Sequence, residues 1–368
     1  METKDELVNR DNSQAAGKVT IIASTSVDGG AERYIARLAC DMTRAGLDTS
    51  LIGHLRPWPA CLPSHSVSVG PKWSLRSLPV ALLRLWPDRH NVLRAVKSAP
   101  AASYGLHFKR EQITLSRALA KTGRVVWTEH GRFPSGVFGL LIRPFYRRAA
   151  RHAAVIICVS HVVAASISSR VDPGTELRVI ETSIETSERL DRQSARDQLG
   201  LSNTSRVAAV VGRLAPSKRP ELAIRAALEA NYSVIVAGTG TMERALRRRY
   251  HNHPGVRLLG HVPDSRIAFA ASDVHIFASN GRGEGFPTVL LESAGYGVPT
   301  VGCTGTGFEL IIEQAGGAVA NPTPRALADA IAAVENRPSL AETAARWAES
   351  KPPAEWLLRQ IAAYRGAL

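Results

Sequence analysis

The sequence predicts an α/β protein with two doubly wound, Rossmann-like domains. Three observations lead to this fold class. The chain has 368 residues, more than twice the ~150 residues of a typical domain. Short apolar runs alternate with stretches of helical periodicity in both halves, which is typical of parallel sheets. A polar, charged stretch from Ile184 to Gly200 separates the two series. We place the domain boundary between residues 185 and 186.

The N-terminal domain is expected to span residues 17–185, after a polar tail of residues 1–16. It opens with a strand, a glycine turn and a helix with apolar periodicity. The same pattern then recurs. The expected strands are Val19–Ala23, Thr49–Gly53, Val125–Thr128 and Ala154–Val159, and the expected helices are Ala31–Ala45, Arg110–Lys121 and Val162–Ser169.

The C-terminal domain is expected to span residues 186–352, beginning with a linker and a surface helix. Residues 353–368 are expected to form a helix that packs back on the N-terminal domain. Ligands of doubly wound sheets bind at the carboxyl ends of the strands, so a cleft between the two domains is the expected reaction site. The expected strands are Val207–Gly212, Ser233–Ala237, Val256–Leu259, Val274–Ala278 and Pro299–Gly302, and the expected helices are Pro220–Ala230, Met242–Tyr250, Ser265–Ala271 and Val289–Tyr296.

The composition, 45% apolar and 21% charged, is that of a folded protein. A net charge of +14 favours anionic partners without choosing among nucleic acid, membrane and phosphorylated ligands. Four cysteines lie far apart in the sequence and suggest neither a disulfide framework nor a zinc site, which fits a reducing compartment. The N-terminus is polar and no apolar run approaches the length of a membrane span. We therefore expect a cytoplasmic protein.

The charge excess lies mainly in the N-terminal domain, with a net +10 for residues 1–185 and +4 for residues 186–368. Two stretches, Lys72–Lys97 and Gly136–Arg151, interleave basic residues with aromatic and aliphatic ones. Such stretches bind anionic lipid, which predicts a peripheral position on the inner face of a membrane. The alternative is an ordinary core face opposite a solvated face.

Two candidate ligand sites follow strands of the N-terminal domain. Asp28-Gly29-Gly30 joins the first strand to a helix, where free amides and partial positive charge suit a phosphate. A Gly-Gly turn that only reverses the chain is the alternative. His130 ends a later strand, at a position where α/β domains place ligand-facing residues, although a single histidine is often structural.

Two further candidate sites lie in the C-terminal domain. Arg213 and Lys218 follow a strand and precede a helix, an arrangement that can clamp a diphosphate. Glu284 lies in a glycine-bounded loop, a helix begins near Thr288, and Glu292 lies a turn inside that helix. Carboxylates accept hydrogen bonds from sugar hydroxyls, and free amides suit a phosphate.

These motifs together resemble the family 4 glycosyltransferases of the GT-B fold, from about Val19 onward. The Glu284/Glu292 pair corresponds to the E-x7-E motif of that family. The motifs, in order, are GGAER, VGRLAPSK, VAGTGTMERAL, GHVPD, SDVHIFAS and EGFPTVLLESAGYGVP.

The resemblance implies transfer of a sugar, with retention, from a nucleotide-diphosphate sugar, UDP-linked first and GDP-linked next. The acceptor would be a lipid-linked glycan, a glycolipid or a natural product. It implies catalytic roles for His130, Glu284, Arg213 and Lys218. The implied donor-binding residues are Gly29, Gly30, Gly238, His261, Val262, Phe286, Pro287, Thr288, Val289, Glu292 and Glu309.

No cofactor or metal is expected, because Arg213, Lys218 and helix amides would stabilise the leaving diphosphate and the chain contains no D-x-D motif. Two rival functions are open. Another GT-B activity, such as a nucleotide-sugar epimerase or a phosphorylase, would use the same motifs. A nucleic-acid-binding protein would use the net charge, but no known nucleic-acid-binding motif accompanies that charge, and we expect no nucleic-acid partner. The oligomeric state is not predicted.

Overall fold

The computed structural model describes residues 17–25, 29–56, 58–63, 67, 78–183 and 189–366. The following parts of the predictions lie outside these residues: the polar tail, Asp28 of the glycine turn, residues 72–77 of the first basic stretch, residues 184–188 around the predicted domain boundary, and residues 367–368 of the predicted C-terminal helix. The chain divides into two compact units, Met1–Thr182 with Ala354–Leu368, and Ser183–Pro353. This division lies close to the boundary expected at residue 185.

Unit 1 contains a six-stranded parallel sheet in the order β2-β1-β3-β4-β5-β6. The chain moves outward from β1 to β2 and then returns to β3, so the strand order reverses between β1 and β3. The strands are β1 Val19–Ser24, β2 Thr49–His54, β3 Ser103–Leu106, β4 Arg124–Glu129, β5 Val155–Cys158 and β6 Leu177–Val179. The helices are α2 Gly30–Arg44, α3 Leu78–Ser98, α4 Lys109–Leu119, α5 Gly136–Ala150, α6 His161–Ser168 and α15 Pro353–Arg365.

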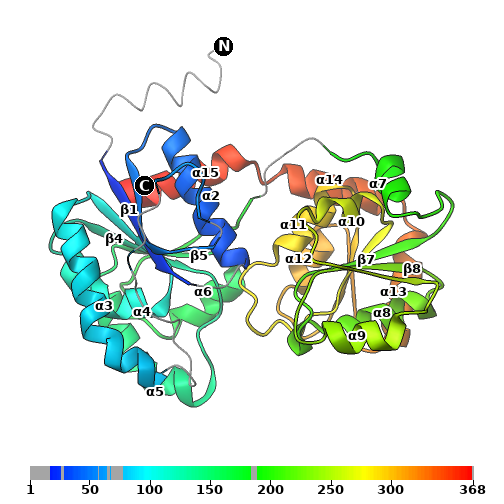
Figure 1. The fold of residues 1–368 in the computed structure, drawn as a ribbon, viewed down its shortest axis with the longest axis horizontal. Coiled ribbons are helices and arrows are strands. Elements are labelled where there is room, and N and C mark those ends of the chain that lie inside the picture. Colours follow the sequence, from blue (N-terminus) through cyan, green and yellow to red (C-terminus); the bar gives the residue numbers. More distant parts are fainter. Residues whose placement is uncertain are drawn as a thin grey trace, which may run out of the picture. The chain divides into compact units, whose positions relative to one another are not determined.

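Figure 1 shows α2 and α15 on one face of this sheet and α3, α4 and α5 on the other. The C-terminal helix α15 is attached to unit 1 by hydrogen bonds from Ser103 Oγ to the Tyr364 carbonyl and from Arg124 Nε to the Ala363 carbonyl. A Cβ atom on Gly105 would lie 2.2 Å from the Tyr364 hydroxyl oxygen, so only glycine lets α15 approach β3 this closely.

Unit 2 contains a second six-stranded parallel sheet in the order β12-β11-β10-β7-β8-β9, reversing between β7 and β10. Helices α8, α9 and α13 cover one face, and α7, α10, α11 and α14 cover the other (Figure 1). The strands are β7 Val207–Val211, β8 Ser233–Ala237, β9 Val256–Gly260, β10 Val274–Phe277, β11 Thr300–Cys303 and β12 Ala318–Ala320. The helices are α7 Arg192–Gln198, the 3-10 turn η2 Pro216–Lys218, α8 Pro220–Glu229, α9 Glu243–Tyr250, α10 Arg266–Ala270, α11 Thr288–Gly295, α12 Glu309–Gln314, α13 Pro324–Glu335 and α14 Ser339–Glu349.

The predicted α/β class with two doubly wound sheets is confirmed. The sequence reading missed the short strands β3, β6 and β12. Each is only three or four residues long, and β6 and β12 are half-buried, so none has the length of apolar or alternating sequence that predicts a strand. It also missed α12, α13 and α14, and it read α3 and α5 only as basic stretches, although both are continuous helices that contain a proline.

The surface helix expected after the domain boundary is α7, in which every residue except Ala195 and Arg196 is exposed. Arg196 of α7 is fully buried and donates hydrogen bonds to the carbonyls of Ala271, Ser202 and Asn203, and to the Asp273 carboxylate. A buried guanidinium with this many acceptors crosslinks α7, the following loop and the end of α10.

The expectation that no disulfide is present is wrong. Cys40 on α2 and Cys61 in the loop after β2 form a disulfide with their Cα atoms 5.4 Å apart. The two cysteines are 21 positions apart, and the segment between them includes β2, which pairs directly with β1 beside α2 and so returns the chain to that helix. Spacing in the sequence alone did not reveal this return.

Candidate active site

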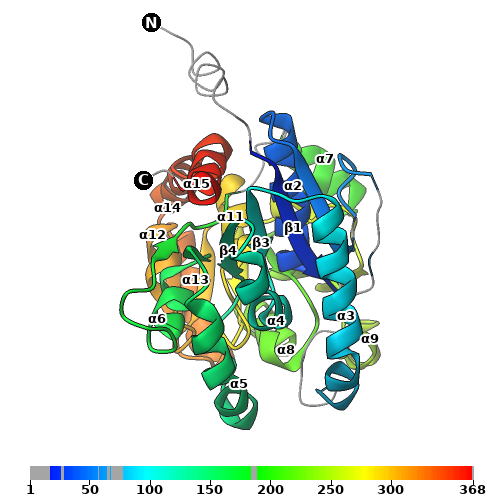
Figure 2. The ribbon, with the colours of Figure 1, turned by 90° about the vertical axis from the view of Figure 1, so that its left-hand side faces the viewer.

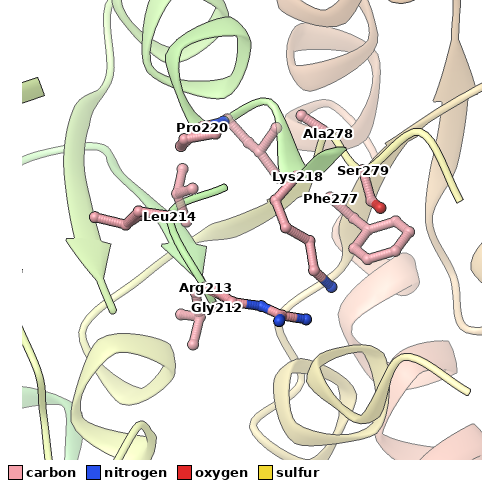
Figure 3. A pocket seen from close by; sticks show the side chains of 11 residues that line it. Gly212, Arg213, Leu214, Lys218, Pro220, Phe277, Ala278 and Ser279 are labelled. Atoms are coloured by element: carbon pink, nitrogen blue, oxygen red, sulfur yellow. The ribbon is translucent and has the colours of Figure 1, made fainter. Parts of the chain in front are cut away.

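Each sheet has one switch point, where the strand order reverses, and ligands of doubly wound sheets bind there. In unit 2 the switch point lies between the carboxyl ends of β7 and β10, and a pocket opens at it. Figure 3 shows Arg213 and Lys218, which both line this pocket, beside the Phe277 ring. The Lys218 ammonium lies 6.0 Å from the centre of that ring. Arg213 is exposed and Lys218 is half-buried.

The position of Lys218 is fixed by its neighbour Arg219, which the sequence reading did not identify. Arg219 has a φ of 48°, unusual for a residue other than glycine, between η2 and α8. Its guanidinium donates to the carbonyls of Ala278 at 2.7 Å and Ser279 at 2.8 Å, just beyond β10. The loop that carries Lys218 is therefore attached to the end of the neighbouring strand. A second basic residue directly before a helix-starting proline was the available signal.

Glu284 pairs directly with Lys218. The Lys218 ammonium donates to Glu284 Oε1, and Ser279 Oγ donates to the same oxygen at 2.8 Å. Glu284 is only 8% exposed, so this carboxylate is largely shielded from water and compensated by Lys218. The structure thus brings together three predicted residues, Arg213, Lys218 and Glu284. It also shows an ion pair between Lys218 and Glu284, which the sequence did not predict.

Glu292 does not share this pairing. It lies in the second turn of α11, is half-buried, and accepts a hydrogen bond of 2.9 Å from Ser265 Oγ before α10. The N-terminus of α11 follows Pro287, with Thr288 as its first residue. The predicted amide group at Phe286–Val289 is therefore the entry into a helix, where unpaired N–H groups and partial positive charge are found.

Gly238 lies where the ends of β7 and β8 meet. It has a φ of 142°, and a Cβ atom there would lie 1.9 Å from the Gly212 carbonyl oxygen. Glycine is thus required by backbone packing at this position, independently of any ligand. Its amide donates to the Gly260 carbonyl at 2.7 Å, next to His261, which is exposed, and Val262, which is half-buried.

Glu309 is the first residue of α12 and turns back on the loop before it. Its Oε1 accepts from the Thr306 amide at 2.8 Å. Burial would raise the pKa of Glu309, but hydrogen bonds from its own amide and those of residues 305–307 lower the pKa below its ordinary value. Its carboxylate therefore occupies amides at a helix N-terminus that could otherwise meet an anion.

In unit 1 the switch point lies between β1 and β3, and two predicted residues follow β1. Gly29 caps α2 and Gly30 begins it. A Cβ atom on Gly29 would lie 2.9 Å from Glu32 Oε2, whereas a Cβ on Gly30 would meet nothing within 4 Å. Packing within the unit therefore does not require glycine at position 30.

His130 follows β4 and contacts His107, which follows β3 at the switch point. His107 Nδ1 and His130 Nε2 are 2.9 Å apart, and the Tyr34 ring lies edge-on to His130 at 4.9 Å. Burial lowers the pKa of His107 to about 3. Sequence reasoning missed His107 because it also missed β3, the strand that His107 directly follows.

A second buried group lies at the same edge of the unit 1 sheet. Glu129, the last residue of β4, accepts hydrogen bonds from the Lys109 ammonium and, at 2.8 Å, from the Tyr146 hydroxyl. Burial lowers the pKa of Lys109 and Glu129 opposes this, whereas burial and Glu129 together raise the pKa of Tyr146. These contacts connect α4, β4 and α5, and we assign them to stability.

Helix α5 has apolar side chains on its outer face as well as its inner one. Ile142 and Tyr146 are buried, while Leu140 is 69% exposed and Phe145 is 59% exposed. Four exposed arginines lie on the same helix or end it, and Arg147 and Arg151 pair with Asp172. In Figure 2, helix α4 lies between α3 and α5 and packs against both. Helix α3 also exposes an aromatic side chain, Trp86. Helix α5 thus has one buried face and one exposed face, and the exposed face carries both arginines and apolar side chains.

Within the described ranges, no three or more His, Cys, Asp or Glu side chains are grouped so as to hold a metal ion. No helix in the described part of the chain is long and apolar enough to span a membrane.

Two doubly wound parallel sheets, with a basic pair and a glutamate at the switch point of the second, define a glycosyltransferase of the GT-B type. Comparison with protein families agrees. Residues 28–188 match the model described as Glycosyltransferase Family 4, and residues 191–352 match the model described as Glycosyl transferases group 1. The chain belongs to the family 4 glycosyltransferases.

Three known proteins illustrate the similarity. One is a mannosyltransferase of Corynebacterium glutamicum, named as a GDP-mannose-dependent monoacylated alpha-(1-6)-phosphatidylinositol monomannoside mannosyltransferase. The two sequences are 30% identical over an alignment of 142 residues, which covers 35% of this chain and 37% of that relative. Sucrose-phosphate synthase from Thermosynechococcus elongatus has a TM-score of 0.79 at 16% identity, over 95% of this chain and 98% of that one. Anabaena HepE, in complex with UDP and glucose, has a TM-score of 0.76 at 18% identity, over 96% and 100%. The two solved structures support the fold.

Proposed function

We propose that this protein is a retaining, metal-independent hexosyltransferase. It moves a sugar from a nucleotide-diphosphate sugar to a hydroxyl of a lipid-linked glycan, a glycolipid or a natural product. A UDP-sugar is the favoured donor and a GDP-sugar the next. Support for these two donors comes from the UDP in the Anabaena structure and the GDP-mannose in the name of the Corynebacterium relative.

The observation that carries the proposal is the pocket at the β7/β10 switch point. Arg213 and Lys218 both line it, and Lys218 is already paired with a carboxylate. A diphosphate would replace Glu284 as the partner of Lys218 and leave that glutamate to accept from a sugar hydroxyl. Charged hydrogen bonds of this kind contribute about 1.5–3 kcal/mol each.

The chemistry then follows from charge. Breaking the bond between the sugar and the diphosphate places negative charge on the leaving oxygen, and Arg213, Lys218 and the amides at the start of α11 stabilise it. Retention follows when the acceptor hydroxyl attacks from the side of the leaving group. The leaving phosphate oxygen accepts the proton of that hydroxyl. His130, Gly29 and Gly30 are proposed to contact the donor from unit 1.

The acceptor side is proposed to lie against an anionic membrane on its inner face. The supporting observations are the exposed Leu140, Phe145 and Trp86 among the arginines of α5 and α3. Basic helices with aromatic residues bind the boundary between headgroups and acyl chains. The printed name of the Corynebacterium relative specifies a phosphatidylinositol-based acceptor, which agrees with a lipid surface.

A panel of UDP-, GDP- and dTDP-sugars tests the proposal by thermal shift and by transfer. A donor at 100 times its dissociation constant adds about 2.7 kcal/mol of stability, which a melting experiment resolves. The anomeric configuration of the product, read by NMR, then tests retention, and undiminished transfer in EDTA tests metal independence. An epimerised or hydrolysed sugar formed without acceptor would instead indicate another GT-B activity. No stabilisation by any nucleotide would contradict the proposal.

A further inference from the structure

His107 and His130 form a pair at the carboxyl ends of neighbouring strands, in which His107 is buried and His130 is half-buried. Leu106 of β3 lies opposite Trp127 of β4 in the parallel register, and each histidine follows its strand. The two rings are stacked, with centroids 5.2 Å apart and an interplanar angle of 23°. Their facing nitrogens, Nδ1 of His107 and Nε2 of His130, are at hydrogen-bond distance, 2.9 Å.

When both rings are neutral, only one hydrogen atom can lie between His107 Nδ1 and His130 Nε2. His107 is 2% exposed, and its pKa of about 3, the result of burial, keeps that ring neutral at physiological pH. The hydrogen is then either on Nδ1 of His107 or on Nε2 of His130. These two arrangements give His130 opposite tautomers.

The surroundings of the second nitrogen of His107, Nε2, distinguish these two tautomeric arrangements. Its Nε2 is buried and has no hydrogen-bond partner among the residues that the structure describes. If His130 donated, this Nε2 would carry the hydrogen and become a buried donor without an acceptor, which proteins tolerate less often than a buried acceptor without a donor. The favoured arrangement has His107 Nδ1–H donating to His130 Nε2. The hydrogen of His130 then lies on Nδ1.

The surrounding side chains hold His130 in this orientation. The Tyr34 ring lies edge-on to His130, with an interplanar angle of 77°, and Gln360 Nε2 of α15 donates to the Tyr34 hydroxyl at 2.6 Å. Trp356 of α15 packs edge-on against Tyr34, 5.3 Å between ring centres. The ring of His130 is thus fixed by hydrogen bonding on one side and by aromatic packing on another.

We propose that His107 is a positioning residue, which holds His130 as the neutral Nδ1–H tautomer and so presents an N–H donor to the transfer reaction. The proposal concerns a residue for which neither motif nor relative supplied a role. It rests on the proposed function for the kinetic consequence, and on the structure alone for the tautomer.

The test records ¹⁵N shifts of the imidazole nitrogens in the full chain, with His130 assigned through a His130→Gln variant. The wild type is expected to show His130 protonated at Nδ1. His107→Asn keeps an N–H near the position of Nδ1 and is expected to keep this tautomer. His107→Leu is similar in size but cannot donate, and His130 is expected to move to the Nε2–H form that isolated histidine prefers. An Nε2–H or cationic His130 in the wild type, or an unchanged tautomer in His107→Leu, would overturn the proposal.

Steady-state kinetics supply the second measurement. With the donor found in the panel, kcat is expected to fall about tenfold in His107→Leu and to recover in His107→Asn, with KM for the donor unchanged; a tenfold change corresponds to one lost hydrogen bond of ordinary strength. An equal kcat in the wild type and in His107→Leu would also overturn the proposal. If the protein transfers no sugar, the proposed function fails while the NMR result still decides the tautomer. If His107→Leu does not fold, the wild type and His107→Asn decide it.

Discussion

Single replacements of Arg213 and Lys218 at the switch point of unit 2 should distinguish a loss of ligand binding from a loss of stability. Arg213 is exposed, whereas Lys218 is half-buried and compensates the buried Glu284. Both Arg213→Met and Lys218→Met are expected to weaken the binding of UDP. Only Lys218→Met is expected to destabilise unit 2. Glu284→Gln is expected to strengthen UDP binding, because it removes the carboxylate that competes with the diphosphate for Lys218.

The magnitudes follow from the contacts. Losing one charged hydrogen bond of about 1.5–3 kcal/mol weakens UDP binding by about 10- to 150-fold. In Lys218→Met, Glu284 keeps only its hydrogen bond from Ser279 among the side-chain contacts described, and a largely buried carboxylate without its cation costs about 1–3 kcal/mol. For a unit of this size, that free energy lowers Tm by about 2–12 °C.

Isothermal titration with UDP measures the affinity, because UDP lacks the transferred sugar and so isolates the diphosphate contacts from the sugar contact proposed for Glu284. Differential scanning calorimetry measures Tm. Arg248→Met on α9 is the matched control, since it removes one exposed charge elsewhere in unit 2 and is expected to change neither quantity. The double variant Lys218→Met/Glu284→Gln is expected to recover the Tm but not the affinity.

Two results would refute this reasoning. Wild-type UDP affinity in both Arg213→Met and Lys218→Met would show that the pocket does not hold the diphosphate. Weaker UDP binding in Glu284→Gln would show that the carboxylate does not compete for Lys218.

Three further predictions concern other parts of the chain. Burial lowers the pKa of His275 to about 3, so as pH falls below about 6.5 only the unfolded chain gains a proton at this group. The free energy of unfolding of unit 2 should therefore fall by about 2 kcal/mol by pH 5. Urea titrations at several pH values should show a smaller fall in His275→Asn. Arg196→Met should destabilise unit 2 by about 3 kcal/mol in the same assay, against less than about 1 kcal/mol for the half-exposed Arg192→Met; equal effects would contradict the crosslinking role of Arg196. Leu140→Ser with Phe145→Ser should reduce co-sedimentation with anionic liposomes at physiological salt without changing Tm, and unchanged binding would exclude α5 as the membrane surface.

Most of the fold was predictable because the spacing of apolar residues along the chain distinguishes strands from helices. The β7–α8 and β10–α11 units carry β-branched strand residues, glycine turns and helix starts, and their bounds differ from the expected ones by at most one residue. The short strands β3 and β12 were not predictable in this way, since their pairing depends on neighbours that are distant in the sequence. The Cys40–Cys61 disulfide depends on the same kind of long-range return.

The candidate site was predictable at the level of residue types but not of contacts. Strand-end positions identified Arg213, Lys218 and His130, and a glycine-bounded loop before a helix identified Glu284. The ion pair between Lys218 and Glu284 and the contact between His107 and His130 join different strand ends, and spacing along the chain contains no information about which ends meet. Roles in the reaction stay predictions for all of these residues.

The attachment of α15 to unit 1 affects how the protein is made. Residues 183–353, the whole of unit 2, are synthesised after most of unit 1 and before the helix that completes it. At 5–20 residues per second this delay lasts roughly 10–40 s. Throughout that time Ser103, Arg124 and Tyr34 lack their partners from α15, and the face of the sheet that Tyr364 covers is open to solvent. Of the two units, the one whose synthesis starts earlier is therefore the one completed later, and until α15 arrives its nascent form exposes the surface that Trp356 and Tyr364 later cover.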